Sequence, residues 1–346
     1  MKEVVSELRQ DLVSGDWVVI ATSRAKRPHD FIIRKRDAFS QPKDTCPFET
    51  LHGNARAVYS LRDSSASQNG GAPHSSGMPD DWWVQVVPNK YPALTAGACP
   101  TVERHGPYQT VAGIGVHEVV ITRDHERALD AMAVPEAELA LRAYQDRLIA
   151  ITQDPCIRYV SIFYNHGPQA GATIAHPHSQ IIATPVIPPD ISRSIAGSGA
   201  YFQIHHECVH CVALAYERQA RERVVYENEH AAVLAPFASK TAFELRVLPL
   251  RHEAYFEAAD AAVRHGVAEA LIAALAKLSK GLDRPDYNFF LHTAPVAEEN
   301  RFAHYHWHIE IIPKTAVWAG FEIGTGIEIS VITPESAAAF LRNISV

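Results

Sequence analysis

The run His-Pro-His-Ser-Gln at residues 176–180 carries the side chains of this sequence that say most about its chemistry. Alternate residues of a β-strand point to the same face, so the run predicts His176, His178 and Gln180 in a row on one side of a strand. Pro177 donates no hydrogen bond to a neighbouring strand. It therefore favours the start or the edge of a sheet, where a ligand can approach.

His178 is the candidate nucleophile. A neutral imidazole, whose ordinary pKa is about 6.5, can attack phosphorus and hold the acquired group as a phosphoramidate until it is transferred. Gln180 is the second candidate catalytic residue, because its amide can donate to a phosphoryl oxygen without supplying an acid that favours attack by water. The alternative interpretation is that His176 and His178 are satisfied histidines at a sheet edge or simply zinc ligands.

The loop before this run, residues 165–173, has the composition of a phosphate cradle. It contains two glycines and no acidic residue, so its backbone amides can face an anion without charge repulsion. The corresponding loop later in the chain carries Glu298 and Glu299, which favours one reacting half and one structural half. A basic cluster at Arg24, Lys26 and Arg27 is by itself typical of a solvated turn, but beside these motifs it favours anion binding.

Two cysteines separated by two residues predict a metal site in the second half. With two histidines they complete a tetrahedral Cys2His2 set, a donor combination typical of structural zinc. The expected ligands are Cys208, Cys211, His252 and His306. His304 and His308 share the expected strand face with His306, so either is an alternative fourth ligand. A redox role is disfavoured because no thioredoxin-like βαβ pattern surrounds the cysteines.

A corresponding metal site is expected in the first half of the chain. Cys46 has His125 and His176 as candidate co-ligands, and Glu49 stands where a second cysteine would be expected. A carboxylate oxygen can bind zinc as a thiolate does. The alternative is that Cys46 is a buried thiol, so we expect one or two structural Zn2+ ions.

Apolar periodicity predicts the same order of elements twice. Each copy consists of a helix, a strand, a loop and a strand with alternate histidines. The expected elements are a helix over 135–151, a strand over 159–164 and a strand from His176, then a helix over 261–280, a strand over 287–292 and a strand across His304, His306 and His308. This repetition predicts an internal duplication.

The duplication predicts an α+β fold, with one antiparallel sheet and packed helices in each half. We expect a first half over residues 1–190 with the nucleophile and a second half over residues 191–346 with the metal site of the cysteine pair. Their seam is expected in the Pro- and Gly-bearing region 185–199. A β-hairpin is expected over 12–22 and a flexible insertion over 63–81.

The composition excludes several classes of protein. The 346 residues carry 32 Lys and Arg against 39 Asp and Glu, a net charge of −7, and 47% of them are hydrophobic. A mildly acidic globular chain is a poor general binder of nucleic acid, and the most apolar helical stretch is too short to cross a membrane. Five cysteines without an export signal favour a reducing, cytoplasmic location, with thiols used for metal ligation or burial rather than for disulfides.

Together these motifs resemble the galactose-1-phosphate uridylyltransferase family, a duplicated branch of the histidine-triad superfamily. The resemblance spans nearly the whole chain. It rests on Gly15-Asp16-Trp17-Val18, Arg24-Ala25-Lys26-Arg27-Pro28, Cys46-Pro47-Phe48, Asn165 with its glycine loop, His176-Pro177-His178-Ser179-Gln180 and Gly320-Phe321-Glu322. It implies a duplicated histidine-triad-like fold of two antiparallel sheets, nucleotidylation of His178 and a homodimer.

The resemblance also implies the binding residues. Contacts to the nucleotide or its phosphates are expected from Arg24, Arg27, Asn89, Asn165, Thr173 and Gln180. Glu322 would bind sugar hydroxyls, in its own subunit or in a neighbouring one. Cys46, His125 and His176 would hold the first zinc ion, and the cysteine pair with His252 and His306 resembles the metal site of the ADP-glucose phosphorylase relatives.

The leading hypothesis is a hexose-1-phosphate uridylyltransferase. His178 would take UMP from UDP-glucose and pass it to galactose 1-phosphate. A second hypothesis is an ADP-sugar or dinucleoside polyphosphate phosphorylase with inorganic phosphate as acceptor, which Glu49, Ala172 and Ser179 favour because they differ from many uridylyltransferases. A third is a non-catalytic, zinc-stabilised nucleotide-binding protein.

Overall fold

A ten-stranded sheet dominates the computed structural model, which describes residues 6–22, 39–49, 55–61, 81–296 and 301–346. Every neighbouring pair of strands in this sheet is antiparallel. In spatial order the strands are β10 (Val224–Glu227), β11 (Ala231–Leu234), β12 (Leu245–Pro249), β14 (His308–Pro313), β13 (Tyr287–His292), β8 (Tyr159–His166), β9 (His178–Thr184), β7 (Val116–Thr122), β4 (Trp82–Pro88) and β3 (Ala57–Ser60). The α+β class expected from the sequence is confirmed.

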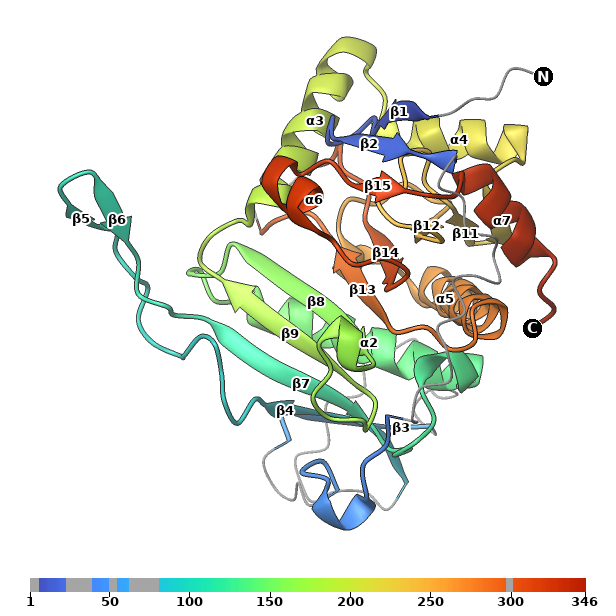
Figure 1. Ribbon diagram of the computed structural model, residues 1–346. Coiled ribbons are helices and arrows are strands. Elements are labelled where there is room, and N and C mark those ends of the chain that lie inside the picture. Colours follow the sequence, from blue (N-terminus) through green and yellow to red (C-terminus); the bar gives the residue numbers. More distant parts are fainter. Residues whose placement is uncertain (1–5, 23–38, 50–54, 62–80, 297–300) are drawn as a thin grey trace, which may run out of the picture.

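Two long helices cover one face of this sheet (Figure 1). α2 (Val134–Ile151) packs on β4 and β7, α5 (Ala261–Gly281) packs on β11 and β12, and the two helices contact each other. Both helices occur within one residue of where apolar periodicity predicts them. The other helices of the described chain are α3 (Pro189–His205), α4 (Val209–Ala220), α6 (Gly320–Thr325) and α7 (Pro334–Arg342), with short turns η3 (Lys43–Thr45), η4 (Leu129–Ala131), η5 (Pro168–Ala170) and η6 (Phe256–Ala258).

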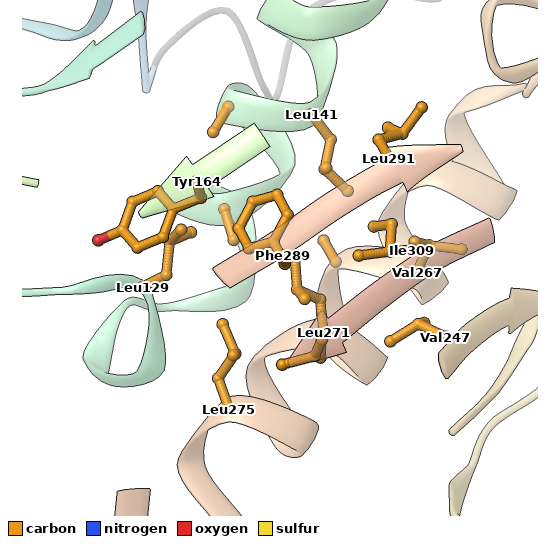
Figure 2. Close-up of a cluster of buried hydrophobic side chains, with 14 of the residues drawn as sticks. Leu129, Leu141, Tyr164, Val247, Val267, Leu271, Leu275, Phe289, Leu291 and Ile309 are labelled. Atoms are coloured by element: carbon orange, nitrogen blue, oxygen red, sulfur yellow. The ribbon is translucent and has the colours of Figure 1, made fainter. Parts of the chain in front are cut away.

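The main hydrophobic core lies between the sheet and these two helices (Figure 2). Phe289 and Ile309 on the sheet, Leu271 on α5 and Leu141 on α2 are all buried in this one cluster. Burying a side chain of this size stabilises the fold by about 1.5–3 kcal/mol. Since the cluster is continuous beneath both halves of the sheet, it holds the strands of both halves in one rigid layer.

Alternation along β9 decides which of its side chains face the helices. Ser179 and Ile181 are buried, whereas His178 and Gln180 are partly exposed. The hydroxyl of Ser179 forms a hydrogen bond with the hydroxyl of Tyr144 on α2. His178 and Gln180 therefore share the face of the sheet that lies away from α2, as the alternation predicts.

The ten strands form two groups of five with the same order. The first group runs β3-β4-β7-β9-β8 and the second runs β10-β11-β12-β14-β13. The prediction of two separate sheets is wrong, because β8 pairs with β13 and joins the groups. Each group ends in a strand whose outer backbone groups would otherwise lack partners, and this pairing satisfies both edges.

The N-terminal hairpin packs against the second group of strands. β1 (Glu7–Gln10) and β2 (Trp17–Ile20) form the predicted hairpin, and β2 also pairs in parallel with β15 (Ile329–Ser330). Asp11 accepts hydrogen bonds of 3.3 Å from the guanidinium of Arg246 on β12. The first strands of the chain thus contact its second half, while the division into halves at residue 190 stays a prediction.

Two strands begin later than the sequence predicts. β9 starts at His178 rather than at His176, and β14 starts at His308, so the two alternate histidines before it precede the strand. The seam expected at 185–199 stays a prediction, and α3 begins within this region at Pro189. The fixed φ of a proline suits the first helical position, which explains why a helix starts there.

Cys99 and Cys156 form a disulfide across a sequence separation of 57. The expectation that all thiols serve metal ligation or burial is wrong for this pair, because a count of cysteines carries no information on which distant residues meet. The bridge ties the segment before β5 to the turn after α2. The cytoplasmic location stays a prediction.

A small hairpin projects from the body of the molecule (Figure 1). It consists of β5 (Glu103–His105) and β6 (Tyr108–Thr110), and all residues of both strands are exposed. No helix formed by the described part of the chain has the length and apolar character needed to cross a membrane. The insertion predicted over 63–81 lies outside the described residues, apart from its last one.

Candidate active site

His178 is the first residue of β9, and a hydrogen bond fixes one of its two ring nitrogens. Its Nδ1–H donates to the carbonyl oxygen of His176 at 2.9 Å, which leaves the lone pair on Nε2. Among the residues that the structure describes, none forms a hydrogen bond with this Nε2. Burial lowers the pKa of His178, so the ring is neutral near pH 7. A neutral imidazole with an open Nε2 lone pair is the form that can attack phosphorus.

Phe48 packs beside this imidazole. The two ring centroids lie 5.0 Å apart with an edge-on orientation, and the same phenyl ring contacts His176 with centroids 5.7 Å apart. The contact restricts rotation of the His178 ring and supplies part of the burial that keeps it neutral. Phe48 belongs to the Cys-Pro-Phe motif of the sequence, but the sequence alone did not indicate that its ring packs against His178.

Gln180, Asn89 and one further residue form a polar row across three adjacent strands. Gln180 Oε1 lies 2.9 Å from His117 Nε2, and Asn89 Nδ2 lies 3.0 Å from the same nitrogen. The row crosses from the end of β4 over β7 to β9. Two of its members were expected to contact the nucleotide, whereas His117 on β7 was missed because it stands in no motif that the sequence analysis used.

The glycine loop between β8 and β9 is held from outside by an acidic residue. Asp286 accepts the Gln169 N–H at 2.6 Å, and a Cβ atom at Gly167 would collide with its carboxylate. Gly167 and Gly171 also have positive φ values of 81° and 88°, which L-residues rarely adopt. The loop is free of acids in sequence, but one of its amides is already used by Asp286 and is unavailable to an anion.

Asn165 lies near the end of β8, and the oxygen of its side-chain amide already accepts a hydrogen bond. Asn288 Nδ2 donates to Asn165 Oδ1 at 2.8 Å and also to the Ala170 carbonyl oxygen at 2.8 Å. The Nδ2 group of Asn165 is therefore the half that can donate to a ligand. Thr173, the other loop residue expected at the nucleotide, is exposed.

Of the remaining expected binding residues, the structure describes only Glu322. Arg24 and Arg27 lie outside the described residues. Glu322 lies on α6, where its carboxylate accepts the Ala319 N–H at 3.0 Å, and within the described chain no contact joins it to β9.

The four side chains expected at the first metal site converge. We define the first metal group as Cys46, Glu49, His125 and His176. His125 Nδ1 lies 3.1 Å from His176 Nδ1 and 2.9 Å from Glu49 Oε1, and Cys46 Sγ lies 3.7 Å from His176 Nδ1.

The outer nitrogens of the two histidines explain why this group fits a cation. His125 Nε2–H donates to the Gln41 carbonyl oxygen at 2.6 Å, and His176 Nε2–H donates to the Thr122 carbonyl oxygen at 2.6 Å. These bonds place both lone pairs on Nδ1 atoms that face each other, an arrangement that a metal ion stabilises. Burial raises the pKa of Cys46, so its thiolate also requires a nearby cation. The donor set of one sulfur, two nitrogens and one oxygen fits zinc.

The cysteine pair forms a second convergent set, with His306 as its fourth member. We define the second metal group as Cys208, Cys211, His252 and His306, whose ligand atoms all lie within 4.8 Å of one another. Cys211 Sγ is 3.3 Å from His252 Nδ1 and 3.4 Å from His306 Nδ1. The hydrogen bond with Cys211 lowers the pKa of Cys208, which favours the thiolate that binds zinc. His304 instead lies 3.3 Å from the Ile195 carbonyl oxygen.

The second half repeats the histidine geometry without an open ring. His308 Nδ1 donates to the His306 carbonyl oxygen at 3.0 Å, as His178 does to His176, but His308 is buried. Glu310 follows where Gln180 stands in the first half, and it accepts a hydrogen bond of 3.0 Å from His292. An acid beside the ring disfavours phosphate, so of these two corresponding histidines in the described chain only His178 has an open ring nitrogen.

A cavity of about 660 Å³ lies along the glycine loop on the side of the first metal group. Its wall includes Asn165, Gly167, His125 and His176, but not His178. This cavity therefore lies beside the loop and the first metal group, and not around the Nε2 atom of His178.

The comparisons with known proteins agree on one family. A family model described as "Domain of unknown function (DUF4921)" matches residues 109–342. The chain is 32% identical to the ADP-glucose phosphorylase of Arabidopsis thaliana, over 98% of this chain and 93% of that protein. It is 29% identical to the galactose-1-phosphate uridylyltransferase of Thermotoga maritima, over 98% of this chain and 99% of that protein.

The solved structures give the same result. The crystal structure of the Arabidopsis thaliana ADP-glucose phosphorylase with bound ADP-glucose matches with a TM-score of 0.79 and 30% identity, over 99% of this chain and 100% of that one. A structure of a uridylyltransferase matches with a TM-score of 0.72 and 25% identity, over 97% of each chain.

Fold and site together define an α+β protein with one open histidine beside an amide-rich loop and two zinc-type donor groups. The chain belongs to the GalT-like enzyme family, whose named members include galactose-1-phosphate uridylyltransferases and ADP-glucose phosphorylase.

Proposed function

We propose that the protein transfers a nucleotidyl group from a nucleotide sugar through a covalent adduct on His178. The observation that carries the proposal is the His178 ring, whose Nδ1–H is fixed on the His176 carbonyl oxygen and whose Nε2 lone pair is open. The acceptor that we favour is inorganic phosphate, which makes the activity that of an ADP-glucose phosphorylase. The support for this choice is the similarity to the Arabidopsis enzyme over nearly the whole chain, together with the second metal group.

Two displacements at the same phosphorus atom make up this reaction. First, the His178 Nε2 lone pair forms a bond to the α-phosphorus. The bond between the α-phosphorus and the oxygen that bridges to the β-phosphorus breaks, and glucose 1-phosphate leaves with the bonding electrons. Next, an oxygen of inorganic phosphate bonds to the same phosphorus, the phosphorus–nitrogen bond breaks, and the ring recovers its lone pair as ADP leaves. The Nδ1–H bond to the His176 carbonyl oxygen stabilises the positive ring of the intermediate.

The neighbouring donors are proposed to stabilise phosphoryl charge in both steps. Gln180 and Asn165 each have an amide nitrogen whose companion oxygen is already bonded, so both amides can donate to phosphate oxygens. Asn89 and Thr173 are proposed to contact the nucleotide, as are Arg24 and Arg27, which lie outside the described residues. The two metal groups are proposed to hold structural Zn2+, which cross-links its ligands and adds folding free energy.

A second candidate acceptor is galactose 1-phosphate, with UDP-glucose as donor. The similarity to the Thermotoga maritima uridylyltransferase favours it, since that relative also aligns over nearly the whole chain. The chemistry at His178 is the same in both cases, so only the nucleobase and the acceptor differ.

We also propose a duplicated histidine-triad-like fold and a homodimer. The identical strand order of the two five-strand groups supports the duplication. Exposed apolar side chains on and before α6, among them Trp318 and Ile323, support a contact with a second chain, because Ile323 is 75% exposed. Glu322 lies on the same helix, so this contact would let it reach the sugar in the partner subunit.

Intact-mass measurement tests the covalent step directly. ADP-glucose is expected to add one AMP to the wild-type protein and none to His178→Asn, and inorganic phosphate should then remove the label as ADP. UDP-glucose and galactose 1-phosphate, offered in the same order, test the second candidate. If neither nucleotide sugar labels the wild type, the protein is a non-catalytic nucleotide binder and the proposal is wrong.

A further inference from the structure

We propose that His117 is a positioning residue, which fixes the side-chain amide of Gln180 so that its NH2 group faces the transferring phosphoryl group. This inference rests on the proposed function. His117 lies on β7, between the end of β4 and β9, and its Nε2 is 2.9 Å from Gln180 Oε1. His117 thus contacts the Gln180 amide, which is proposed to bind phosphate, but lies outside the His-Pro-His-Ser-Gln run.

The backbone fixes which nitrogen of His117 carries the proton. The Ala93 N–H, which can only donate, lies 3.0 Å from His117 Nδ1. Nδ1 must therefore offer its lone pair, and in a neutral ring the proton then resides on Nε2. The opposite tautomer would set two N–H groups against each other.

The turn after β4 positions the backbone N–H of Ala93 against the His117 ring. Asn89 N–H donates to the His117 carbonyl oxygen at 2.9 Å, and Asn89 Oδ1 accepts the Tyr91 N–H at 2.8 Å. These two bonds close the chain over the end of β7, so that the Ala93 N–H meets Nδ1. The tautomer of His117 is thus set by a folded turn and does not depend on a ligand.

The proton on Nε2 in turn fixes the orientation of Gln180. An Nε2–H donor requires an acceptor, so the oxygen of the Gln180 amide faces His117. The amide nitrogen, on the other side, is the group left to donate, and no described residue accepts a hydrogen bond from it. Because Gln180 shares the open face of β9 with His178, this donor points to the side on which phosphorus would be attacked.

The amide of Asn89 also has a fixed orientation, set by the Tyr91 N–H. Its Oδ1 is occupied by the Tyr91 N–H, so its Nδ2 is a donor, yet it lies 3.0 Å from a ring nitrogen that also donates. Neither group satisfies the other, and a ligand oxygen would satisfy the Asn89 amide. The row therefore presents donors from both ends: His117 orients the Gln180 amide, and the Tyr91 N–H orients the Asn89 amide.

Without the ring, the Gln180 amide can turn by half a rotation and present its oxygen to the phosphoryl group. Removing one donor that stabilises a developing anion typically lowers the rate by about 100- to 1,000-fold. A misoriented but still present amide should cost less. We expect His117→Ala to slow nucleotidylation of His178 by about 10- to 100-fold.

A double-mutant cycle on single-turnover labelling tests this role. The donor is whichever of ADP-glucose and UDP-glucose labels the wild type, and the variants are His117→Ala, His117→Gln, Gln180→Ala and the double alanine variant. We expect the loss in His117→Ala with a dissociation constant within about threefold of wild type, and recovery of most of the rate in His117→Gln, whose amide N–H can donate at the Nε2 position. In the Gln180→Ala background, His117→Ala should cause no further loss.

Other results overturn the inference. An unchanged rate in His117→Ala, an equal loss in the Gln180→Ala background, or a loss confined to nucleotide affinity each show that His117 does not act through Gln180. If His117→Ala does not fold, nitrogen-15 NMR of the wild-type histidines still decides, because a proton on Nδ1 of His117 excludes this role. If the wild type is not labelled at all, the proposed function fails and this role fails with it.

Discussion

The carbonyl oxygen of His176 accepts the hydrogen bond from His178 Nδ1 at 2.9 Å, while the ring of the same residue points its own Nδ1 into the first metal group. One residue thus belongs to the metal group through its side chain and orients the reactive ring through its backbone. We therefore expect the first metal group to help orient His178 through this carbonyl oxygen, without supplying an atom to the proposed reaction.

The first prediction concerns the loss of that group. His125→Ala removes a ligand that does not touch His178, and we expect it to abolish zinc binding at the first metal group. Freed from the ion, His176 no longer holds its carbonyl oxygen in place, and groups that orient an active site through a metal typically change activity by about 10- to 100-fold. The zinc content per chain and the rate of His178 nucleotidylation are the two measurements.

The matched control for this prediction is Cys211→Ser in the second metal group. It should also remove one zinc ion, but the rate of His178 nucleotidylation should stay within about threefold of wild type, because the second group orients the closed His308 rather than the open His178. An equal loss of rate in both variants would show that zinc supports only the fold.

The second prediction concerns stability. Cys211→Ser should lower the melting temperature, because the zinc-bound second group joins α4, the segment around His252 and the residues before β14. A chelator should lower the melting temperature of the wild type but have a smaller effect on the variant, which has one site less to lose. A variant that melts like the wild type, with or without chelator, would contradict a structural metal at this site.

The third prediction concerns the contact between Tyr144 and Ser179, the residue that follows His178. Tyr144→Phe leaves the buried Ser179 hydroxyl without its partner, and an unsatisfied buried hydroxyl costs about 1–3 kcal/mol. Urea denaturation of Tyr144→Phe should show this loss in the free energy of unfolding. The double variant Tyr144→Phe, Ser179→Ala removes both hydroxyls and should lose less than the two single variants combined. Strictly additive losses would mean that the two groups do not interact.

The sequence was sufficient to predict the elements that depend on local pattern. The helices near 135–151 and 261–280 follow from apolar spacing, and the shared face of His178 and Gln180 follows from alternation in a strand. The sequence also predicted that the four side chains of the second metal group come together, because the cysteine spacing is a strong local signal, while metal binding by this group stays a prediction.

Features that depend on contacts between distant segments could not be predicted in this way. The pairing of β8 with β13, the disulfide between Cys99 and Cys156 and the hydrogen bond from Asp286 to the glycine loop each join residues that no local pattern connects. His117 was missed for the same reason, since its significance lies in two distant neighbours, Gln180 on β9 and Ala93 in the turn after β4.

The fourth prediction concerns the pH dependence of stability. Glu257 lies next to α5, and burial raises its pKa to about 7, with a smaller contribution from Glu253. One of its oxygens, Oε2, is buried without a hydrogen-bond partner among the described residues. The folded protein therefore binds a proton at Glu257 that the unfolded chain, with an ordinary glutamate pKa near 4.3, has already released.

The sign of the effect follows from this difference. Stability from this residue is fully present below about pH 4 and is lost as the pH rises through about 7, because the folded state must then ionise a buried carboxyl. Glu257→Gln cannot ionise, so it should be more stable than the wild type at pH 8 by about 1–3 kcal/mol and nearly equal to it at pH 4. Urea denaturation at the two pH values measures the difference, with the exposed Glu229→Gln as the matched control. A gain that is the same at both pH values would contradict a raised pKa and point instead to a better packed amide.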